Sequence, residues 1–235
     1  MERNRQILVS DYDQTFYLND EDIEKNKIAV REFRNKGNIF VFATGRSFLD
    51  FQNKAKLYNL EYDYVIINHG ATILDKDDNI FYNFSIKNEI IDNLKSNLQL
   101  DKTIDGFCCS KLESRVDFSY KDLTKINVKY VSKELAKNIN DEINSKYSQY
   151  VNSYWISGSS LEIISSETNK SKAIKLLLEK LNVPNRNIYT IGDGYSDIQM
   201  VKDFKGVAMA DSVKELKKVA KKEYKSVSDL IKEII

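Results

Sequence analysis

The chain has 235 residues, of which 42% are hydrophobic and 30% charged, as is usual for a soluble globular protein with a buried core. Lys and Arg (36) nearly balance Asp and Glu (35) and are scattered among them, so the charge pattern gives no support for nucleic acid as a partner. No apolar run approaches a membrane span, and the first one, which stops at Asp11, is too short for a signal peptide. The two cysteines are neighbours, which rarely bridge, so we expect a cytoplasmic protein.

Short apolar runs that do not alternate predict strands buried on both faces of a parallel sheet. They occupy residues 7–9, 39–43, 64–67, 188–191 and 206–209. Helical patterns cover residues 20–36, where Gly37 follows as the expected C-cap, and residues 170–181. This β-α-β order predicts an α/β fold with a doubly wound parallel sheet.

The middle of the chain has a different pattern, in which a helix followed by two strands occurs twice. The expected elements are a helix at about 87–99, two strands within 103–131, a helix at 132–147 and a hairpin at 149–164 that turns near 157–159. This pattern predicts an inserted α+β domain with an open, mostly antiparallel sheet. We therefore expect a core domain made of residues 1–80 and 166–235 and an insert made of residues 81–165.

Two carboxylates follow the first predicted strand, in the segment D-Y-D-Q-T. Ligands of open α/β sheets bind at the carboxyl ends of the strands, and residues at i and i+2 of an extended chain face one side. Asp11 and Asp13 can therefore share a site, where their repulsion would call for a cation or a proton. Taken alone, the segment is equally compatible with a polar strand end that forms an Asx turn.

The second predicted core strand ends in Thr44, Gly45 and Arg46. A hydroxyl, an accessible backbone and a guanidinium can bind a phosphate together, although the same residues also suit an ordinary turn. Lys170 opens a predicted helix, where the helix dipole disfavours a cation unless an anion lies nearby; a solvated lysine is the alternative.

A third predicted strand end carries Asp193 and Asp197, with glycine on both sides of Asp193. Carboxylates at i and i+4 in a tight turn offer the oxygen ligands that suit Mg²⁺. All four segments are expected at one edge of the sheet, and together they supply the groups needed for phosphoryl transfer with a hard metal ion.

With these four segments in this order, the chain resembles the haloacid dehalogenase-like superfamily. The insert also resembles the cap of the Cof-type branch, as do the segments I-I-N-H-G-A-T-I (66–73), L-E-I-I-S-S-E-T-N-K (161–170) and G-V-A-M-A (206–210). The resemblance implies a Rossmann-like core with an α+β cap, and a Mg²⁺-dependent phosphatase that acts on a small phosphorylated metabolite through an aspartyl-phosphate.

Carried over by position, the resemblance gives each candidate residue a role. Asp11 would be the nucleophile and Asp13 the general acid and base, while Thr44, Gly45 and Lys170 would hold the phosphoryl group. Arg46 would contact the substrate. The Mg²⁺ ligands would be Asp11, the backbone carbonyl of Asp13, Asp193 and Asp197.

The chain departs from the family pattern at Gln14, where glycine is usual, at Ser196, where asparagine is usual, and at His69, where asparagine is common. None of these changes removes a catalytic group. A phosphosugar mutase of the phosphomannomutase type is the nearest alternative function, and a phospho-accepting signalling domain is a more distant one. The sequence identifies neither the substrate nor the oligomeric state.

Overall fold

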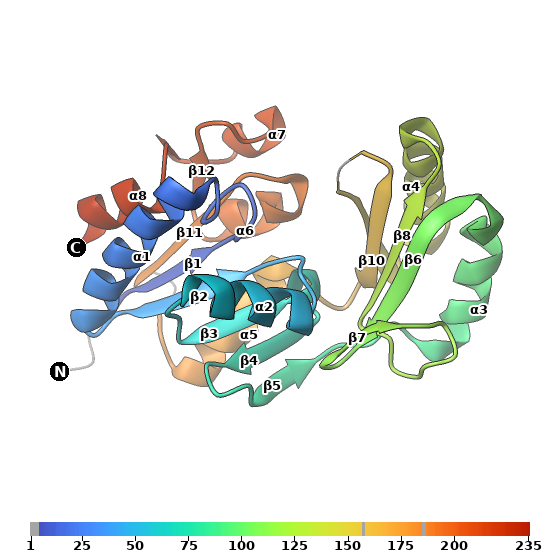
Figure 1. Cartoon of the computed structure of the whole chain (residues 1–235), viewed down its shortest axis with the longest axis horizontal. Coiled ribbons are helices and arrows are strands. Elements are labelled where there is room, and N and C mark those ends of the chain that lie inside the picture. Colours follow the sequence, from blue (N-terminus) through green and yellow to red (C-terminus); the bar gives the residue numbers. More distant parts are fainter. Residues whose placement is uncertain (1–4, 157, 185–186) are drawn as a thin grey trace.

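The computed structural model describes residues 5–156, 158–184 and 187–235, which form an α/β core and a cap. The chain crosses from core to cap after β5 and returns after β10, so that the cap lies beside the core (Figure 1). The core elements before the cap are β1 (Ile7–Ser10), α1 (Asp20–Asn35), β2 (Ile39–Ala43), α2 (Phe48–Tyr58), β3 (Tyr64–Ile67), η1 (Asn68–Gly70), β4 (Thr72–Asp75) and β5 (Ile80–Asn83). Those after it are α5 (Lys170–Leu181), β11 (Ile188–Gly192), η4 (Tyr195–Asp197), α6 (Ile198–Asp203), β12 (Val207–Met209), α7 (Lys214–Lys217), β13 (Glu223–Tyr224) and α8 (Val227–Ile234).

The core sheet has eight strands in the order β13-β12-β11-β1-β2-β3-β4-β5. The first six of these run parallel, and β4 and β5 are added antiparallel at one edge. Alternate strand residues enter two apolar layers: Leu8 packs with α1, α2 and α8, whereas Val9 packs with α5 and α6. Helices therefore cover both faces, which confirms the predicted doubly wound parallel sheet.

The cap has a five-stranded antiparallel sheet in the order β7-β6-β8-β10-β9, with helices packed on one face. Its elements are α3 (Asn88–Asn97), η2 (Leu100–Lys102), β6 (Thr103–Ser110), β7 (Glu113–Val116), β8 (Lys125–Tyr130), α4 (Lys133–Tyr147), β9 (Val151–Trp155) and β10 (Ser160–Ser165). The two helices share an apolar layer with the sheet, and the other face of the sheet is turned toward the core (Figure 1).

The structure corrects some of the predicted bounds. Residues 103–131 contain three strands instead of two, because β7 forms a short hairpin with β6. The predicted boundary after residue 80 falls inside β5, which pairs with β4, so the core sheet continues to Asn83. The last predicted core strand begins at Val207 instead of residue 206. Part of the predicted turn at 157–159 lies outside the described residues, since residue 157 is not among them.

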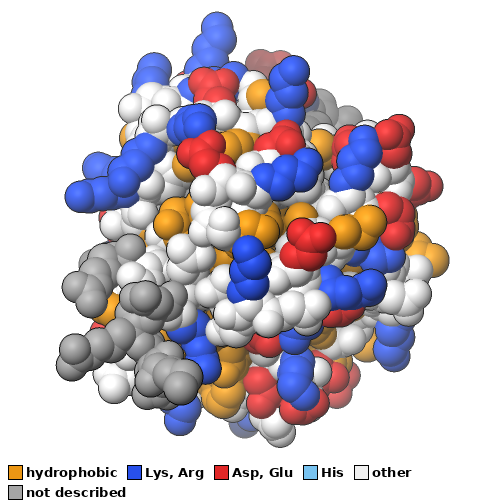
Figure 2. Space-filling view, turned by 90° about the vertical axis from the view of Figure 1, so that its left-hand side faces the viewer, with side chains coloured by type: hydrophobic (Ala, Val, Ile, Leu, Met, Phe, Trp, Pro, Cys, Tyr) orange, Lys and Arg blue, Asp and Glu red, His pale blue; other side chains and the backbone are white. Residues whose placement is uncertain are grey.

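The end of the core that faces away from the cap has a mixed surface charge. Lys and Arg side chains are interspersed with Asp and Glu side chains over the part shown in Figure 2. Within the described ranges, no helix has the length and apolar character needed to cross a bilayer.

Candidate active site

The adjacent parallel strands β1 and β11 bring the first and last predicted segments together. Ser10 pairs with Ile191, and the backbone N–H of Asp11 donates to the Ile191 carbonyl at 3.0 Å. Lys170 opens α5 behind Asn169, whose side chain caps the helix by accepting from the backbone N–H of Lys172. The two strand ends and the helix start therefore place their polar side chains at one edge of the sheet.

Three carboxylates and one ammonium form the floor of the site. Ligand oxygens of Asp11, Asp193 and Asp197 all lie within 4.8 Å of one another. The Lys170 ammonium donates to Asp11 at 2.5 Å and to Asp197 at 2.6 Å, and its side chain is only 2% exposed. The structure thus brings together four of the predicted residues, and the anion beside Lys170 is a pair of carboxylates.

Burial and mutual repulsion shift the protonation of this cluster. Burial raises the pKa of Asp11 well above its usual range, with Asp197 and Asp193 adding to the rise and Lys170 opposing it. Burial, followed by the charge of Asp197, raises the pKa of Asp193 to about 6. Burial alone would lower the pKa of Lys170, but Asp11 and Asp197 raise it above its usual value. One ammonium therefore faces more negative charge than it can compensate.

A tight turn fixes the Asp197 carboxylate against the backbone of Asp193 and Gly194. One Asp197 oxygen accepts from the backbone N–H groups of Asp193 at 3.1 Å and Gly194 at 3.0 Å. A Cβ at Gly192 would lie 2.5 Å from the Asp197 carboxyl carbon, so this position requires glycine. The Thr15 hydroxyl also donates to Asp193 at 2.7 Å, which gives a role to the threonine of D-Y-D-Q-T that the sequence interpretation missed.

Asp13 lies above this floor and is paired with Arg46. The guanidinium donates to both Asp13 oxygens, at 2.8 Å and 2.6 Å, while 47% of the Asp13 side chain stays exposed. Arg46, which we predicted as a substrate contact, lines the cavity described below and is also the partner of Asp13. This fork-like pairing fixes the direction of the Asp13 carboxylate.

The Thr44–Arg46 segment is stabilised by the buried Thr44 side chain and packs against His69. Thr44 is fully buried, and its hydroxyl accepts from the Arg46 backbone N–H at 3.1 Å. Gly45 lines the cavity described below, and a Cβ there would collide with the ring of His69. The close approach that demands glycine at this position is therefore to a side chain of the protein itself.

The cap contributes two charged residues that the sequence interpretation did not single out. Lys125 on β8 donates to the Gly45 carbonyl at 2.7 Å and to Glu162 at 2.9 Å, and Glu162 on β10 also forms a very short contact with His69. Glu162 lies in the segment 161–170, and its resemblance to the family pattern is the one sequence signal that could have identified Glu162 as a site residue. Lys125 carries no such signal, because it is one of many lysines.

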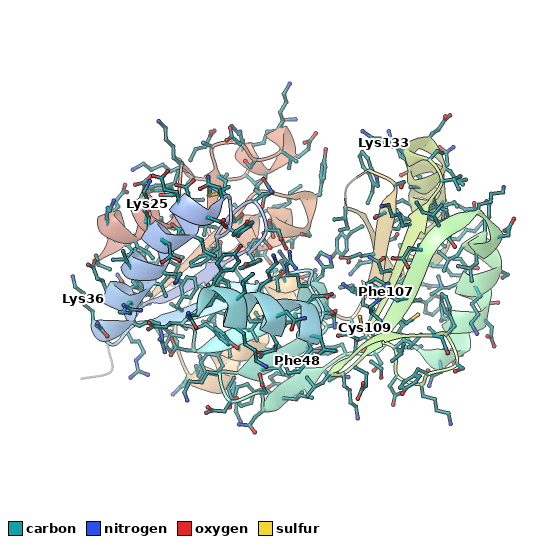
Figure 3. All side chains as sticks on the ribbon, in the orientation of Figure 1. Lys25, Lys36, Phe48, Phe107, Cys109 and Lys133 are labelled. Carbon is teal, nitrogen blue, oxygen red and sulfur yellow. The ribbon has the colours of Figure 1, made fainter. Side chains whose placement is uncertain are left out.

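A cavity of about 930 Å³ lies between the floor and the cap. From the core it is lined by groups that include Asp11, Asp13, Lys170 and Ser196, and from the cap by polar and aromatic side chains. The cap residues among its lining are Phe107, Lys125, Asn140, Ser153, Tyr154, Trp155, Ile156 and Glu162. Phe107 lies on β6, as labelled in Figure 3, where side chains of both domains project into the space between them.

The floor fits a hard divalent cation. Its three candidate ligands are all carboxylates, the donors that Mg²⁺ prefers, and Lys170 compensates only one of their charges. The two remaining negative charges equal the charge of one divalent ion. The raised pKa values of Asp11 and Asp193 express the same deficit of positive charge.

Comparison with known proteins supports the same assignment. The family model of the haloacid dehalogenase-like hydrolases matches residues 8–116 and 106–230. A Buchnera aphidicola protein, named provisionally as a phosphatase, is 27% identical and covers 90% of this chain and 89% of its own. The 5-amino-6-(5-phospho-D-ribitylamino)uracil phosphatase of Bacillus subtilis is 25% identical, with coverage of 91% and 87%.

A solved structure shares the whole fold. A haloacid dehalogenase-like hydrolase from Bacteroides thetaiotaomicron superimposes with a TM-score of 0.82 over 98% of this chain and 100% of that chain, at 19% identity. Core sheet, inserted cap and carboxylate floor thus occur here in a chain that the family model spans almost completely. The chain belongs to the haloacid dehalogenase-like hydrolase family.

Proposed function

We propose that this hydrolase is a phosphatase that cleaves a small phosphate monoester with Asp11 as its nucleophile. The observation that carries the proposal is the position of Asp11, which contacts Lys170 and lies among the carboxylates at the floor of a cap-covered cavity. A carboxylate is a weak base but a competent nucleophile toward phosphorus when nearby cations offset the repulsion between two anions.

The residues of this chain suit a two-step reaction. An Asp11 oxygen would attack phosphorus as the ester P–O bond breaks, and Asp13 would give a proton to the leaving alkoxide. Water would then attack phosphorus while Asp13 takes back a proton, and the P–O bond to Asp11 would break to release phosphate. The proposed phosphate-binding residues are Gly45 and Lys170, which line the cavity, together with the adjoining Thr44, which lies beneath the lining. Arg46 would aim Asp13 along both steps.

Mg²⁺ would be held by Asp11, Asp193 and Asp197, together with the backbone carbonyl of Asp13. When bound, this ion supplies a positive charge that offsets the charge of the phosphoryl group and of the carboxylates. Asp197 is prepared for that role by its two backbone hydrogen bonds, and Asp193 by Thr15.

The cavity favours a small metabolite over a macromolecular phosphate. Its volume is sufficient for a compact phosphorylated molecule, and the cap covers the approach to Asp11. Lys and Arg (36) are balanced by Asp and Glu (35), so the chain has no large excess of positive charge that would attract a polyanion. The Bacillus subtilis relative, named as a phosphatase for a phosphorylated ribityl compound, supports the same class of substrate.

The test is phosphate release from a panel of phosphorylated metabolites by the purified protein in Mg²⁺, compared with the Asp11→Asn variant. The amide keeps the shape but loses nucleophilicity and charge, so kcat should fall by at least about 10³-fold. Continuous phosphate release without an added sugar bisphosphate would also exclude a mutase. Turnover by Asp11→Asn close to that of the original protein would refute Asp11 as the nucleophile.

A further inference from the structure

A buried polar network connects the cap to the core beside the proposed phosphate-binding segment. Lys125 on β8 donates to the core carbonyl of Gly45 at 2.7 Å and to Glu162 of its own domain at 2.9 Å. The second Glu162 oxygen contacts Nε2 of His69 in the core. Asn127 of the cap adds a third donor to Glu162 at 3.0 Å. Two cap strands therefore reach two core loops through one continuous set of hydrogen bonds.

The side chains of the network are almost completely buried. The exposed fractions are 2% for the Lys125 side chain, 5% for His69 and 13% for Glu162. Burial alone would raise the pKa of Glu162, but Lys125 and His69 hold it well below its usual range. Burial lowers the pKa of His69, so its ring is neutral near pH 7. An ionised Glu162 only accepts, which places the ring proton on Nε2 and leaves the buried Nδ1 without a partner among the residues that the structure describes.

On the core side, the network supports the backbone of the Thr44–Arg46 segment. The His69 backbone N–H donates to the Thr44 carbonyl at 2.9 Å, and Lys125 binds the next carbonyl, that of Gly45. The Asn68 N–H donates to the Arg46 carbonyl at 2.9 Å. Arg46 in turn directs Asp13. A change in cap position would therefore remove the Lys125 contact to Gly45 directly and would reach Thr44 only through His69, whose ring contacts Glu162.

We propose that Glu162, His69 and Lys125 are positioning residues that couple the position of the cap to the geometry of the Thr44–Arg46 segment. Within the described residues, none of the three forms a hydrogen bond with Asp11, so their effect acts through the segment. Moving the cap away would separate Glu162 from His69 and Lys125 from Gly45, while the Lys125–Glu162 pair, which lies within the cap, would remain. The segment is thus fully supported only when the cap is in place.

Amide hydrogen exchange tests the coupling without any substrate. In Glu162→Asp the charge that compensates Lys125 remains, but the shorter side chain no longer reaches His69. Exchange in peptides covering residues 44–46 and 66–70 should become at least about tenfold faster, whereas exchange in α1 should not change. In Glu162→Gln, which also loses the charge, the increase should be larger.

Asp105→Asn is the matched control, because it removes a carboxylate from the same cap sheet at an exposed pair with Arg115. This variant should leave exchange at 44–46 and 66–70 within about twofold of the original protein. If Glu162→Gln unfolds, α1 will lose protection as well, and Glu162→Asp then decides the question. Unchanged exchange at 44–46 and 66–70 in a folded Glu162→Asp protein would overturn the proposal.

A kinetic measurement tests whether the network also affects catalysis. Only this part of the experiment rests on the proposed phosphatase function. With p-nitrophenyl phosphate, kcat/KM should fall at least about tenfold in Glu162→Asp and stay within about twofold in Asp105→Asn. A protein that exchanges as predicted but hydrolyses no ester would refute the phosphatase proposal and leave the coupling intact. Faster exchange with unchanged kcat/KM would refute the role of the network in positioning the segment for catalysis.

Discussion

Replacing Lys170 by methionine should destabilise the metal-free protein, abolish turnover and strengthen Mg²⁺ binding at once. The ammonium makes contacts of 2.5 and 2.6 Å with Asp11 and Asp197, all almost completely buried. Methionine has a similar length but no charge, so Asp11, Asp193 and Asp197 would face one another without compensation.

The size of the effect follows from this burial. Removing one partner of a buried ion pair costs about 3–5 kcal/mol. For a chain of this size, that free energy corresponds to a fall in Tm of about 6–20 °C in EDTA. Added Mg²⁺ should reduce the difference, because it restores positive charge among the same carboxylates. Turnover should nevertheless fall by at least about 10³-fold, since Lys170 is also a proposed phosphate ligand.

Lys175→Met is the control, because Lys175 lies on the same helix and pairs with Asp203 at 2.6 Å while 48% of its side chain is exposed. Its loss should cost at most about 1 kcal/mol. The assays are thermal unfolding in EDTA and in Mg²⁺, calorimetry of Mg²⁺ binding, and phosphate release. Equal Tm values for the two variants in EDTA, or weaker Mg²⁺ binding by Lys170→Met, would refute the charge argument.

Three further outcomes follow from the site. Added Mg²⁺ should raise the Tm of the protein. Ca²⁺ should support turnover poorly because its larger, looser coordination shell does not suit a site adapted to Mg²⁺, and full turnover after exhaustive metal removal would contradict the metal requirement. Arg46→Lys keeps the charge but loses the pair of hydrogen bonds to Asp13, so kcat should fall about 10- to 100-fold for an alkyl phosphate. The fall should be smaller for p-nitrophenyl phosphate, whose leaving group needs little protonation, and equal losses for both esters would argue against this role of Arg46. Gln14→Gly should raise Tm by about 1–4 °C, because Gln14 has a φ of 60°, in the region that favours glycine. A lower Tm would instead show that the Gln14 side chain stabilises the loop.

Much of the core could be predicted because its strands are buried on both faces. Such strands appear in the sequence as continuous apolar runs, and the polar residues that follow them are then expected at one sheet edge. This reasoning brought Asp11, Asp193 and Asp197 together, and the structure places their oxygens within one small cluster. The edge strands were harder to predict: β5 is partly exposed, and β13 spans only two residues.

The partners of individual side chains could not be predicted, because they depend on how separate loops approach in space. Asp13, predicted as the general acid and base, and Arg46, predicted as a substrate contact, are 33 positions apart, and their pairing with each other was not predicted. The pairing of Lys125 with Gly45 spans 80 positions and crosses from cap to core. The local sequence pattern around these residues does not indicate which distant residue each one contacts.

The departures from the family pattern at Gln14 and His69 have a shared structural setting. Both residues have positive φ, 60 for Gln14 and 56 for His69, in loops that follow core strands. A non-glycine residue is uncommon in this conformation, although histidine occurs there more often than glutamine, and in both positions other contacts hold the residue. The Gln14 N–H donates to Tyr17, and the His69 N–H donates to Thr44 while its ring contacts Glu162 of the cap. At Gln14 the described support comes from the adjoining turn, whereas at His69 it also comes from the other domain. The conformation of His69 is therefore supported by contacts from both domains, which is the arrangement expected if cap position and the geometry of the Thr44–Arg46 segment are coupled.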